Sequence, residues 1–455
     1  MQNKDYFKNI QSIINKLNLK ILISIPGIFR TTNRIDKKIK TKHKFQLFEN
    51  DTAIQYTKKV KNSKIFFISH YLGNVSDQNL DFYYHDLFKK LQKDKKMFSV
   101  ILLNKTSEKP KQIIKKFSKS KISRIIINNY THPLNNPLLI LWIIFQFLIF
   151  KFKLTFVKLT NKEKQLTKIF TLRKFLQTRN TLSFTQKIKK IVKRTKIKFF
   201  FSTFEGHSFE KNLISHFNKR KIKTFGYFFS VIRNFDSCIF YDFEKKTTPL
   251  YILFTGQVVK KIFLKKIKSS FEDTKFDIMG YTRPVKKIKS NSKKKFILIC
   301  PEGFYNETEK MLNFAQKLLS KYNKIRIIFR LHPEIKISNI KFPKYLKKND
   351  RFIFSKNTLE EDLSKSKLLL YRGSSVCINA INNNIIPIYL NLGDYLNIDP
   401  LYEINKNIVN STKDVKKYLD FIDQKKKYNF KKFQKYTSSY FQNFEYSKFK
   451  KMISG

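Results

Sequence analysis

The chain has 455 residues, enough for two domains, and its 42% hydrophobic residues exclude a disordered protein. Its formal net charge is +61, from 94 Lys and Arg against 33 Asp and Glu. Taken alone, this charge predicts attraction to nucleic acid or to an anionic membrane surface. The lysines are spread along the whole chain while Gly, Pro and Trp are scarce. The residue usage of an AT-rich coding sequence is therefore the simpler explanation.

The cysteines and the N-terminus indicate where the protein works. Cys238, Cys300 and Cys377 lie far apart without CxxC spacing, which argues against a disulfide framework and a zinc site. The first residues interrupt their apolar positions with Lys and Asn, unlike the apolar run of a signal peptide. We therefore expect a cytoplasmic protein that uses neither a cofactor nor a metal.

The N-terminal half shows the alternation of strands and helices that is typical of a doubly wound sheet. Residues 1–60 form an extension without a clear pattern, and residues 61–288 are expected to fold as a Rossmann-like domain. We expect a helix at 81–92, and we expect strands, some with the loops that follow them, at 64–76, 98–104, 124–129, 198–203, 223–229, 251–257 and 276–284.

One apolar segment of this half, residues 137–154, allows three interpretations. Its uncharged part, Leu138–Phe150, is shorter than the roughly 20 residues of a spanning helix. It is a buried core helix, a helix lying in the membrane face with Trp142 and lysine flanks, or a transmembrane span. The stretch after it, residues 158–196, is very basic and predicted to be mostly helical.

The C-terminal half predicts a second Rossmann-like domain over residues 289–410, followed by helices over 411–455. Apolar β-branched runs begin at Phe296, Ile325 and Lys367, and each leads into a polar loop. The fold class is therefore α/β, with two Rossmann-like domains that face a cleft. In such sheets, ligand-binding groups follow the carboxyl ends of the strands.

Three loops of the second half carry candidate ligand-binding residues. Glu302 and Gly303 follow the first strand, and the simpler alternative for Glu302 is a charge at a helix start. Arg330 and His332 end the second strand, and Pro333 keeps the residue before it extended, so we expect His332 to point into the cleft. There it is suited to bind a phosphate or protonate a leaving group, although a lone His at a strand end is usually structural.

The third loop is R-G-S-S, residues 372–375. Arg372, Ser374 and Ser375 stand at a strand-to-helix turn, where open N–H groups bind anions. Helix capping alone explains one of the two serines. The sequence lacks both the G-x-x-x-x-G-K-[ST] and the G-x-G-x-x-G pattern, which rules against a P-loop and a dinucleotide fingerprint.

The first half has a matching turn, E-G-H. Glu205 and His207 follow a strand there, and Glu205 is our candidate for activating an acceptor hydroxyl. His70, after an earlier strand, is a further candidate to line the cleft. The alternative for all three is a structural role in their turns.

The order of these short motifs resembles a known group of enzymes. The motifs are E-G (205–206), G-Y (226–227), P-E-G (301–303), H-P (332–333) and S-S before an apolar helix (374–381). They resemble bacterial surface-carbohydrate biosynthesis glycosyltransferases of the GT-B fold. More distantly, they are similar to polysialyltransferases, capsule Kdo transferases and CDP-glycerol-type polymerases. The pattern departs from these families at His207, Phe228 and Phe229.

The resemblance implies roles for individual residues. His332, Ser374 and Ser375 would contact the donor nucleotide phosphate, and Glu205 would be the base. The protein would then transfer a sugar from a nucleotide-activated donor to a surface polysaccharide, such as a capsule, or to a lipid-linked glycan. The transfer would be inverting and metal-independent, and the enzyme would work at the inner membrane face.

Two alternatives remain beside this interpretation. The first is a polyol-phosphate transferase of the CDP-glycerol type on the same fold. The second is a basic nucleic-acid-binding protein, which the charge alone suggests. The aromatic residues lie mainly inside apolar strands rather than among the lysines, so no specific nucleic-acid partner is expected.

Overall fold

The computed structural model divides the chain into two compact units. Unit 1 comprises Met1–Phe229, Asp236–Arg283 and Asn443–Gly455, and unit 2 comprises Ser230–Phe235 and Pro284–Gln442. The structure describes residues 3–19, 21–22, 55–56, 63–73, 77–106, 108–128, 137–193, 195–232, 239, 245–267, 271–283, 288, 295–333, 335, 337–393, 398–404, 407–424 and 428–454.

Unit 1 is built on an eight-stranded sheet with the order β1-β4-β3-β2-β5-β6-β7-β8. The short β1 pairs antiparallel with β4, and the other neighbours are parallel. Its strands are β1 (Gln55–Tyr56), β2 (Ile65–Tyr71), β3 (Phe98–Asn104), β4 (Ser123–Asn128), β5 (Phe199–Thr203), β6 (Lys223–Phe228), β7 (Tyr251–Phe254) and β8 (Lys275–Ile278). The central strands β2, β3 and β5 are buried along their whole length, as continuous apolar runs in parallel sheets require.

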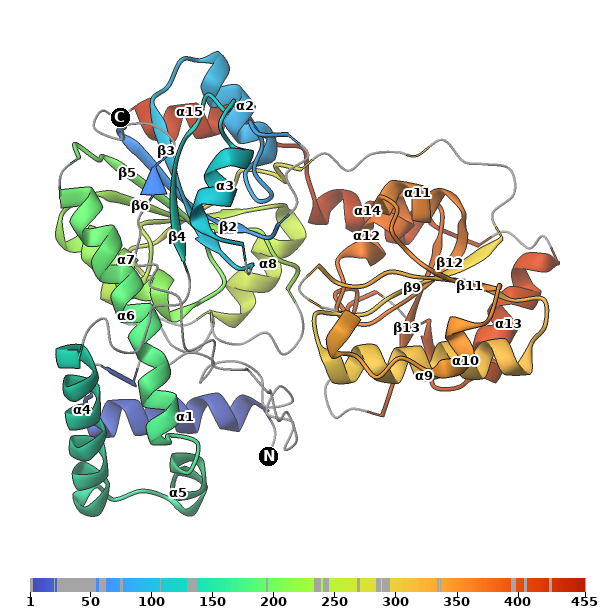
Figure 1. Cartoon of the computed structure of the whole chain (residues 1–455), viewed down its shortest axis with the longest axis horizontal. Coiled ribbons are helices and arrows are strands. Elements are labelled where there is room, and N and C mark those ends of the chain that lie inside the picture. The colour runs from blue at the N-terminus through green and yellow to red at the C-terminus, as the bar shows by residue number, and fades with distance from the viewer. Residues whose placement is uncertain are drawn as a thin grey trace. The chain divides into compact units, whose positions relative to one another are not determined.

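Helices cover both faces of this sheet (Figure 1). They are α2 (His85–Lys93), α3 (Pro110–Lys116), α7 (Ser208–Lys219), α8 (Gln257–Lys266) and α15 (Tyr446–Ser454), with a 3-10 turn, η4, at Lys245–Thr247. The core is rich in aromatic rings, and Phe67 and Phe201 stack at a centroid distance of 4.9 Å. Phe449 of α15 packs on Phe201, so the end of the chain completes the core of unit 1.

Beside the sheet, unit 1 carries a separate group of helices (Figure 1). They are α1 (Asn3–Leu17), α4 (Pro137–Phe156), α5 (Asn161–Thr167) and the first turns of α6 (Leu172–Lys193). These helices share their own apolar core, in which Phe150 and Phe175 are fully buried. An ion pair of 2.8 Å between Lys16 Nζ and Glu163 Oε2 joins α1 to α5.

Unit 2 is built on a six-stranded sheet with the order β11-β10-β9-β12-β13-β14, parallel throughout. Its strands are β9 (Phe296–Cys300), β10 (Arg326–Phe329), β11 (Phe352–Phe354), β12 (Ser366–Tyr371), β13 (Ile386–Leu390) and β14 (Ile408–Val409). Its helices are α9 (Tyr305–Lys321), η6 (Ile337–Asn339), α10 (Lys344–Lys347), α11 (Leu359–Ser364), α12 (Val376–Asn382), α13 (Thr412–Asp423) and α14 (Lys431–Tyr440).

These two sheets confirm the predicted fold class, an α/β protein with two Rossmann-like domains. The strands expected near residues 64–71, 98–104 and 198–203 are present almost residue for residue. The segments expected at 251–257 and 276–284 form shorter strands, β7 and β8. Strand β7 ends at Phe254 because Gln257 already begins a helix, and β8 ends at Ile278. Apart from α1 and β1, the predicted extension 1–60 lies mostly outside the described residues.

Candidate active site

Each sheet has a point where the strand order reverses direction. In unit 1 it lies between β2 and β5, and in unit 2 between β9 and β12. In open parallel sheets, ligands bind outside the carboxyl ends of the strands at such a point. All of the predicted site residues lie at the carboxyl ends of β2, β5, β9, β10 or β12. The topology therefore brings them together in two groups, one in each unit.

In unit 1 the E-G-H turn after β5 holds a carboxylate against an imidazole. Gly206 has a φ of +76°, a left-handed conformation that favours glycine. This sharp turn brings Glu205 Oε2 to 3.1 Å from His207 Nε2, with both side chains half-buried. An acid held by a neighbouring imidazole at a strand end is suited to accept a proton.

Glu210, in the first turn of α7, binds the backbone of the E-G-H turn. Its Oε2 accepts hydrogen bonds from the backbone N–H of Glu205, at 3.0 Å, and of His207, at 2.9 Å. Its carboxyl is fully buried, and this burial, together with the Glu205 charge, raises the pKa of Glu210 to about 8. Glu210 was not among the predicted site residues, although Glu at the third helical position is a capping-box signal.

His70 lies beside this pair, near the end of β2. Its ring centroid is 6.5 Å from that of His207 and 6.0 Å from that of Phe209. Burial, followed by the charge of Lys105, lowers the pKa of His70 well below its ordinary value. Among the described residues none forms a hydrogen bond with the buried His70 Nδ1. An unpaired buried nitrogen is costly unless a ligand or water completes it.

In unit 2 the loops after β9 and β10 meet. A Cβ atom built on Gly303 would lie 3.0 Å from His332 Nδ1 and 3.3 Å from His332 Cε1. The imidazole therefore rests directly over the glycine, and a larger residue would displace it. Gly303 of P-E-G therefore provides the space that the His332 imidazole of H-P occupies.

Glu302 and Arg372 are joined through a third residue, Glu307 of α9. Glu307 Oε1 accepts from the Glu302 backbone N–H at 2.8 Å, and Glu307 Oε2 lies 3.2 Å from Arg372 Nε. Arg372 is 2% exposed, and its Nη1 donates to the Leu390 carbonyl at 3.1 Å. The Arg372 guanidinium therefore bonds to groups within unit 2. We assign Arg372 to holding the loops after β9 and β12 together.

Arg330 is also engaged within unit 2. Its Nη1 lies 2.8 Å from Asp362 Oδ2 and donates to the Asn357 carbonyl at 2.7 Å. Asp362 is fully buried in α11 and also accepts from Ser355 Oγ at 2.5 Å. Asp362 was not among the predicted site residues. The structure shows that it is the partner of Arg330.

The two serines after β12 differ in their bonding. Ser374 Oγ accepts from the Val376 N–H at a long 3.4 Å. Ser375 is the residue that precedes α12, yet within the described part of the chain its hydroxyl makes no capping hydrogen bond. Capping therefore does not explain Ser375. Among the described residues, no group of three His, Cys, Asp or Glu side chains is placed to hold a metal ion.

Comparisons with known proteins give structural similarities only. No family model and no curated protein matches the sequence. Among solved structures, a UDP-GlcNAc 2-epimerase from Methanocaldococcus jannaschii is 13% identical, with a TM-score of 0.45 over 80% of this chain and 94% of that chain. HepE from Anabaena, in complex with UDP and glucose, is 9% identical, with a TM-score of 0.46 over 86% and 98%.

A wall teichoic acid polymerase, TagF, is 12% identical, with a TM-score of 0.41 over 85% of this chain and 84% of that chain. The fold class itself rests on the strand orders of the two sheets.

Proposed function

We propose that this protein is a glycosyltransferase that moves a sugar from a nucleotide-activated donor to a surface polysaccharide or a lipid-linked glycan. The observation that carries the proposal is the position of the candidate residues. They all lie at the carboxyl ends of strands at or next to the two switch points, where parallel sheets bind their ligands.

The donor half of the proposal concerns unit 2. His332, supported by Gly303, and the hydroxyls of Ser374 and Ser375 would contact the donor phosphates. An imidazole and hydroxyl groups stabilise the negative charge that develops on a leaving nucleotide. Arg330 and Arg372 would act through their ion pairs with Asp362 and Glu307, by positioning these loops.

The acceptor half concerns unit 1. Glu205, held by His207, would take the proton of an acceptor hydroxyl, and the acceptor oxygen would form a bond to the anomeric carbon of the sugar. The bond from that carbon to the donor phosphate oxygen would break, and the nucleotide would leave with its electron pair. His70 Nδ1, buried and without a partner among the described residues, would receive a polar group of the acceptor.

We further propose an inverting, metal-independent reaction on the cytoplasmic side of the membrane. Direct attack by the acceptor oxygen inverts the anomeric carbon. The charge of the leaving phosphate would be neutralised by the groups of unit 2 rather than by a divalent ion.

The test measures the binding of nucleotides to the full chain by thermal shift and by calorimetry. The panel is CMP, CDP, UDP and GDP, their sugar conjugates, and CDP-glycerol. We expect one nucleotide class to raise the melting temperature, because a ligand that binds only the native state stabilises it. His332→Ala should lose the shift, and His85→Ala, which changes a histidine outside both groups of site residues, should keep it.

Glu205→Gln separates binding from chemistry. It should bind the nucleotide like the unchanged protein but release no nucleotide product when acceptor is added. A shift with CDP-glycerol alone would instead establish a polyol-phosphate transferase. Absence of any shift, with tight salt-sensitive binding to RNA or DNA, would overturn the proposal.

A further inference from the structure

The helix α4 exposes an apolar stripe along its whole length. We define the α4 stripe as Leu138, Leu141, Phe145, Leu148, Phe152 and Phe156, with Trp142 beside it. The spacing of three and four residues places these side chains on one face of the helix. Their exposed fractions run from 43% for Trp142 to 76% for Leu138. A contiguous apolar face of this length marks an interaction surface.

The opposite face of α4 is fixed to unit 1. Leu139, Ile143 and Phe150 are buried against the core that α4 shares with α1 and α6. At the C-terminal end of the helix, Lys153 Nζ donates to the Leu17 carbonyl of α1 at 2.9 Å. The interpretation of residues 137–154 as a fully buried core helix is therefore wrong, because only one of the two faces of α4 is covered.

By length and composition α4 is the one helix of the described chain that is able to cross a membrane. Crossing would separate it from α1 and α6 and expose the buried Ile143 and Phe150. A helix that keeps one face on the protein and leaves the other free matches a position in the plane of a lipid surface.

The surroundings of the α4 stripe are strongly basic. Glu163 is the single acidic residue between Pro137 and Lys193, and it is paired with Lys16. The lysines within and after the stripe along the chain include exposed ones, namely Lys151, Lys158, Lys162, Lys164 and Lys168. Lysines next to an apolar face attract anionic lipid headgroups. They also disfavour a second copy of this chain, since a two-fold interface would place like charges together.

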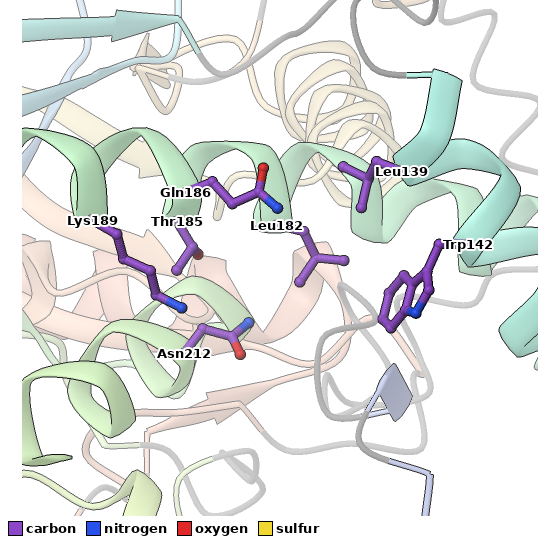
Figure 2. A pocket seen from close by; sticks show the side chains of 7 residues that line it. All are labelled: Leu139, Trp142, Leu182, Thr185, Gln186, Lys189 and Asn212. Carbon is purple, nitrogen blue, oxygen red and sulfur yellow. The ribbon is translucent and has the colours of Figure 1, made fainter.

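A hollow of about 300 Å³ opens beside the α4 stripe, between α4, α6 and α7 (Figure 2). Trp142, Leu139 and Leu182 form its apolar end, and Lys189 and Asn212 lie at its polar end (Figure 2). Burial lowers the pKa of Lys189, so a nearby anion would favour its charged form. Apolar groups at one end and a cation at the other suit the headgroup region of a membrane.

We propose that α4 docks the protein on an anionic lipid bilayer. The helix lies in the plane of the membrane surface, with its stripe among the acyl chains and the lysines at the lipid phosphates. This inference goes beyond the proposed reaction and depends on different residues. Membrane docking and the proposed glycosyl transfer can therefore fail independently.

Trp142 is the only tryptophan in the chain, so its fluorescence reports on this surface without a label. The full chain is mixed with vesicles of phosphatidylcholine alone or with added phosphatidylglycerol. We expect co-sedimentation and a blue shift of the Trp142 emission with the anionic vesicles only. Added salt should weaken the binding, because it screens the lysines.

The variant Leu141→Gln/Phe145→Gln/Leu148→Gln should lower the vesicle partition by roughly tenfold or more for each side chain. Its melting temperature should stay unchanged, because these side chains are exposed. The matched control Leu264→Gln/Ile337→Gln changes leucine and isoleucine side chains that are 41% and 51% exposed elsewhere, and it should bind like the unchanged protein.

Depth-dependent quenching by brominated lipids separates the two membrane orientations. The unchanged protein is compared with Trp142→Phe/Phe152→Trp. Docking in the plane puts both tryptophans at one shallow depth, whereas a helix that spans the bilayer puts both positions within about 8 Å of the bilayer centre. Deep positions for both tryptophans would overturn the proposal. An unchanged Trp142 emission without co-sedimentation would also overturn it. So would a dimer in solution that dissociates in the variant Leu141→Gln/Phe145→Gln/Leu148→Gln.

Discussion

Replacing Gly303 with alanine tests the contact on which the proposed donor site depends. The new Cβ would lie 3.0 Å from His332 Nδ1, 3.3 Å from Cε1 and 3.4 Å from Cγ. Ordinary van der Waals contact begins near 3.4 Å, so the imidazole must retreat by about 0.4 Å for the atoms to fit.

The size of the effect follows from this displacement. Overpacking of this kind typically costs about 1–3 kcal/mol, and we expect the low end, because His332 stands on a loop. A charge-assisted hydrogen bond contributes roughly 1.5–3 kcal/mol. If the displacement loses about half of one such bond, nucleotide binding weakens by roughly fourfold to thirteenfold.

The assay is a double-mutant cycle with Gly303→Ala, His332→Ala and the combined variant. Free energies of unfolding come from urea titration, and dissociation constants come from calorimetry with the nucleotide that the screen identifies. Once His332 is an alanine, the new Cβ meets no imidazole. Gly303→Ala should then have almost no further effect on either quantity.

Additive effects would refute the reasoning. If Gly303→Ala lowered stability equally with and without the His332 ring, the glycine would serve the backbone and not the imidazole. If the two stability effects were coupled but those on binding were not, the contact would be real and His332 would have no role in the donor site.

Three further predictions concern other residues. Arg372→Ala leaves the buried Glu307 without its partner and should cost about 3–5 kcal/mol of stability, measured by urea unfolding; full stability with lost nucleotide binding would instead make Arg372 a direct ligand. Burial raises the pKa of Glu210 to about 8, so its contribution to stability is present below its unfolded pKa of 4.5 and is lost as the pH rises through about 8. The decline in the free energy of unfolding amounts to roughly 5 kcal/mol at most, at about 1.4 kcal/mol per pH unit. Glu210→Gln should flatten it, as measured by unfolding curves taken across this pH range. Gly280→Ala should unfold unit 1, because its φ is +87° and a Cβ would lie 2.2 Å from the Asn443 carbonyl oxygen; a melting temperature within a degree of the unchanged protein would contradict the contact.

Much of the fold was readable from local sequence patterns. Buried strands such as Phe98–Asn104 and Phe199–Thr203 are continuous runs of apolar residues, many of them β-branched or aromatic, and this signal needs no tertiary information. The turns that follow them contain polar or small residues, as with Glu205, Gly206 and His207. Because parallel strands bind ligands at their carboxyl ends, these motifs predicted candidate ligand-binding residues at those positions of the chain.

The roles of the two arginines depended on tertiary structure. Arg372 and Glu307 are 65 residues apart, and Arg330 and Asp362 are 32 apart. These partners meet because β12 and β10 flank β9 on opposite sides. A local pattern does not contain the strand order, so the sequence did not reveal the two ion pairs that these arginines form.

The segment 137–154 also shows the difference between what local sequence predicts and what depends on tertiary structure. Its apolar residues determine that it is a helix and that it avoids water, and they are compatible with a core, a membrane surface or a span. Which side chains are covered depends on where α1 and α6 pack, through contacts between residues far apart in the chain. Secondary structure follows from local periodicity, whereas exposure and pairing follow from the arrangement of elements, and for this protein the candidate site and the docking surface are both of the second kind.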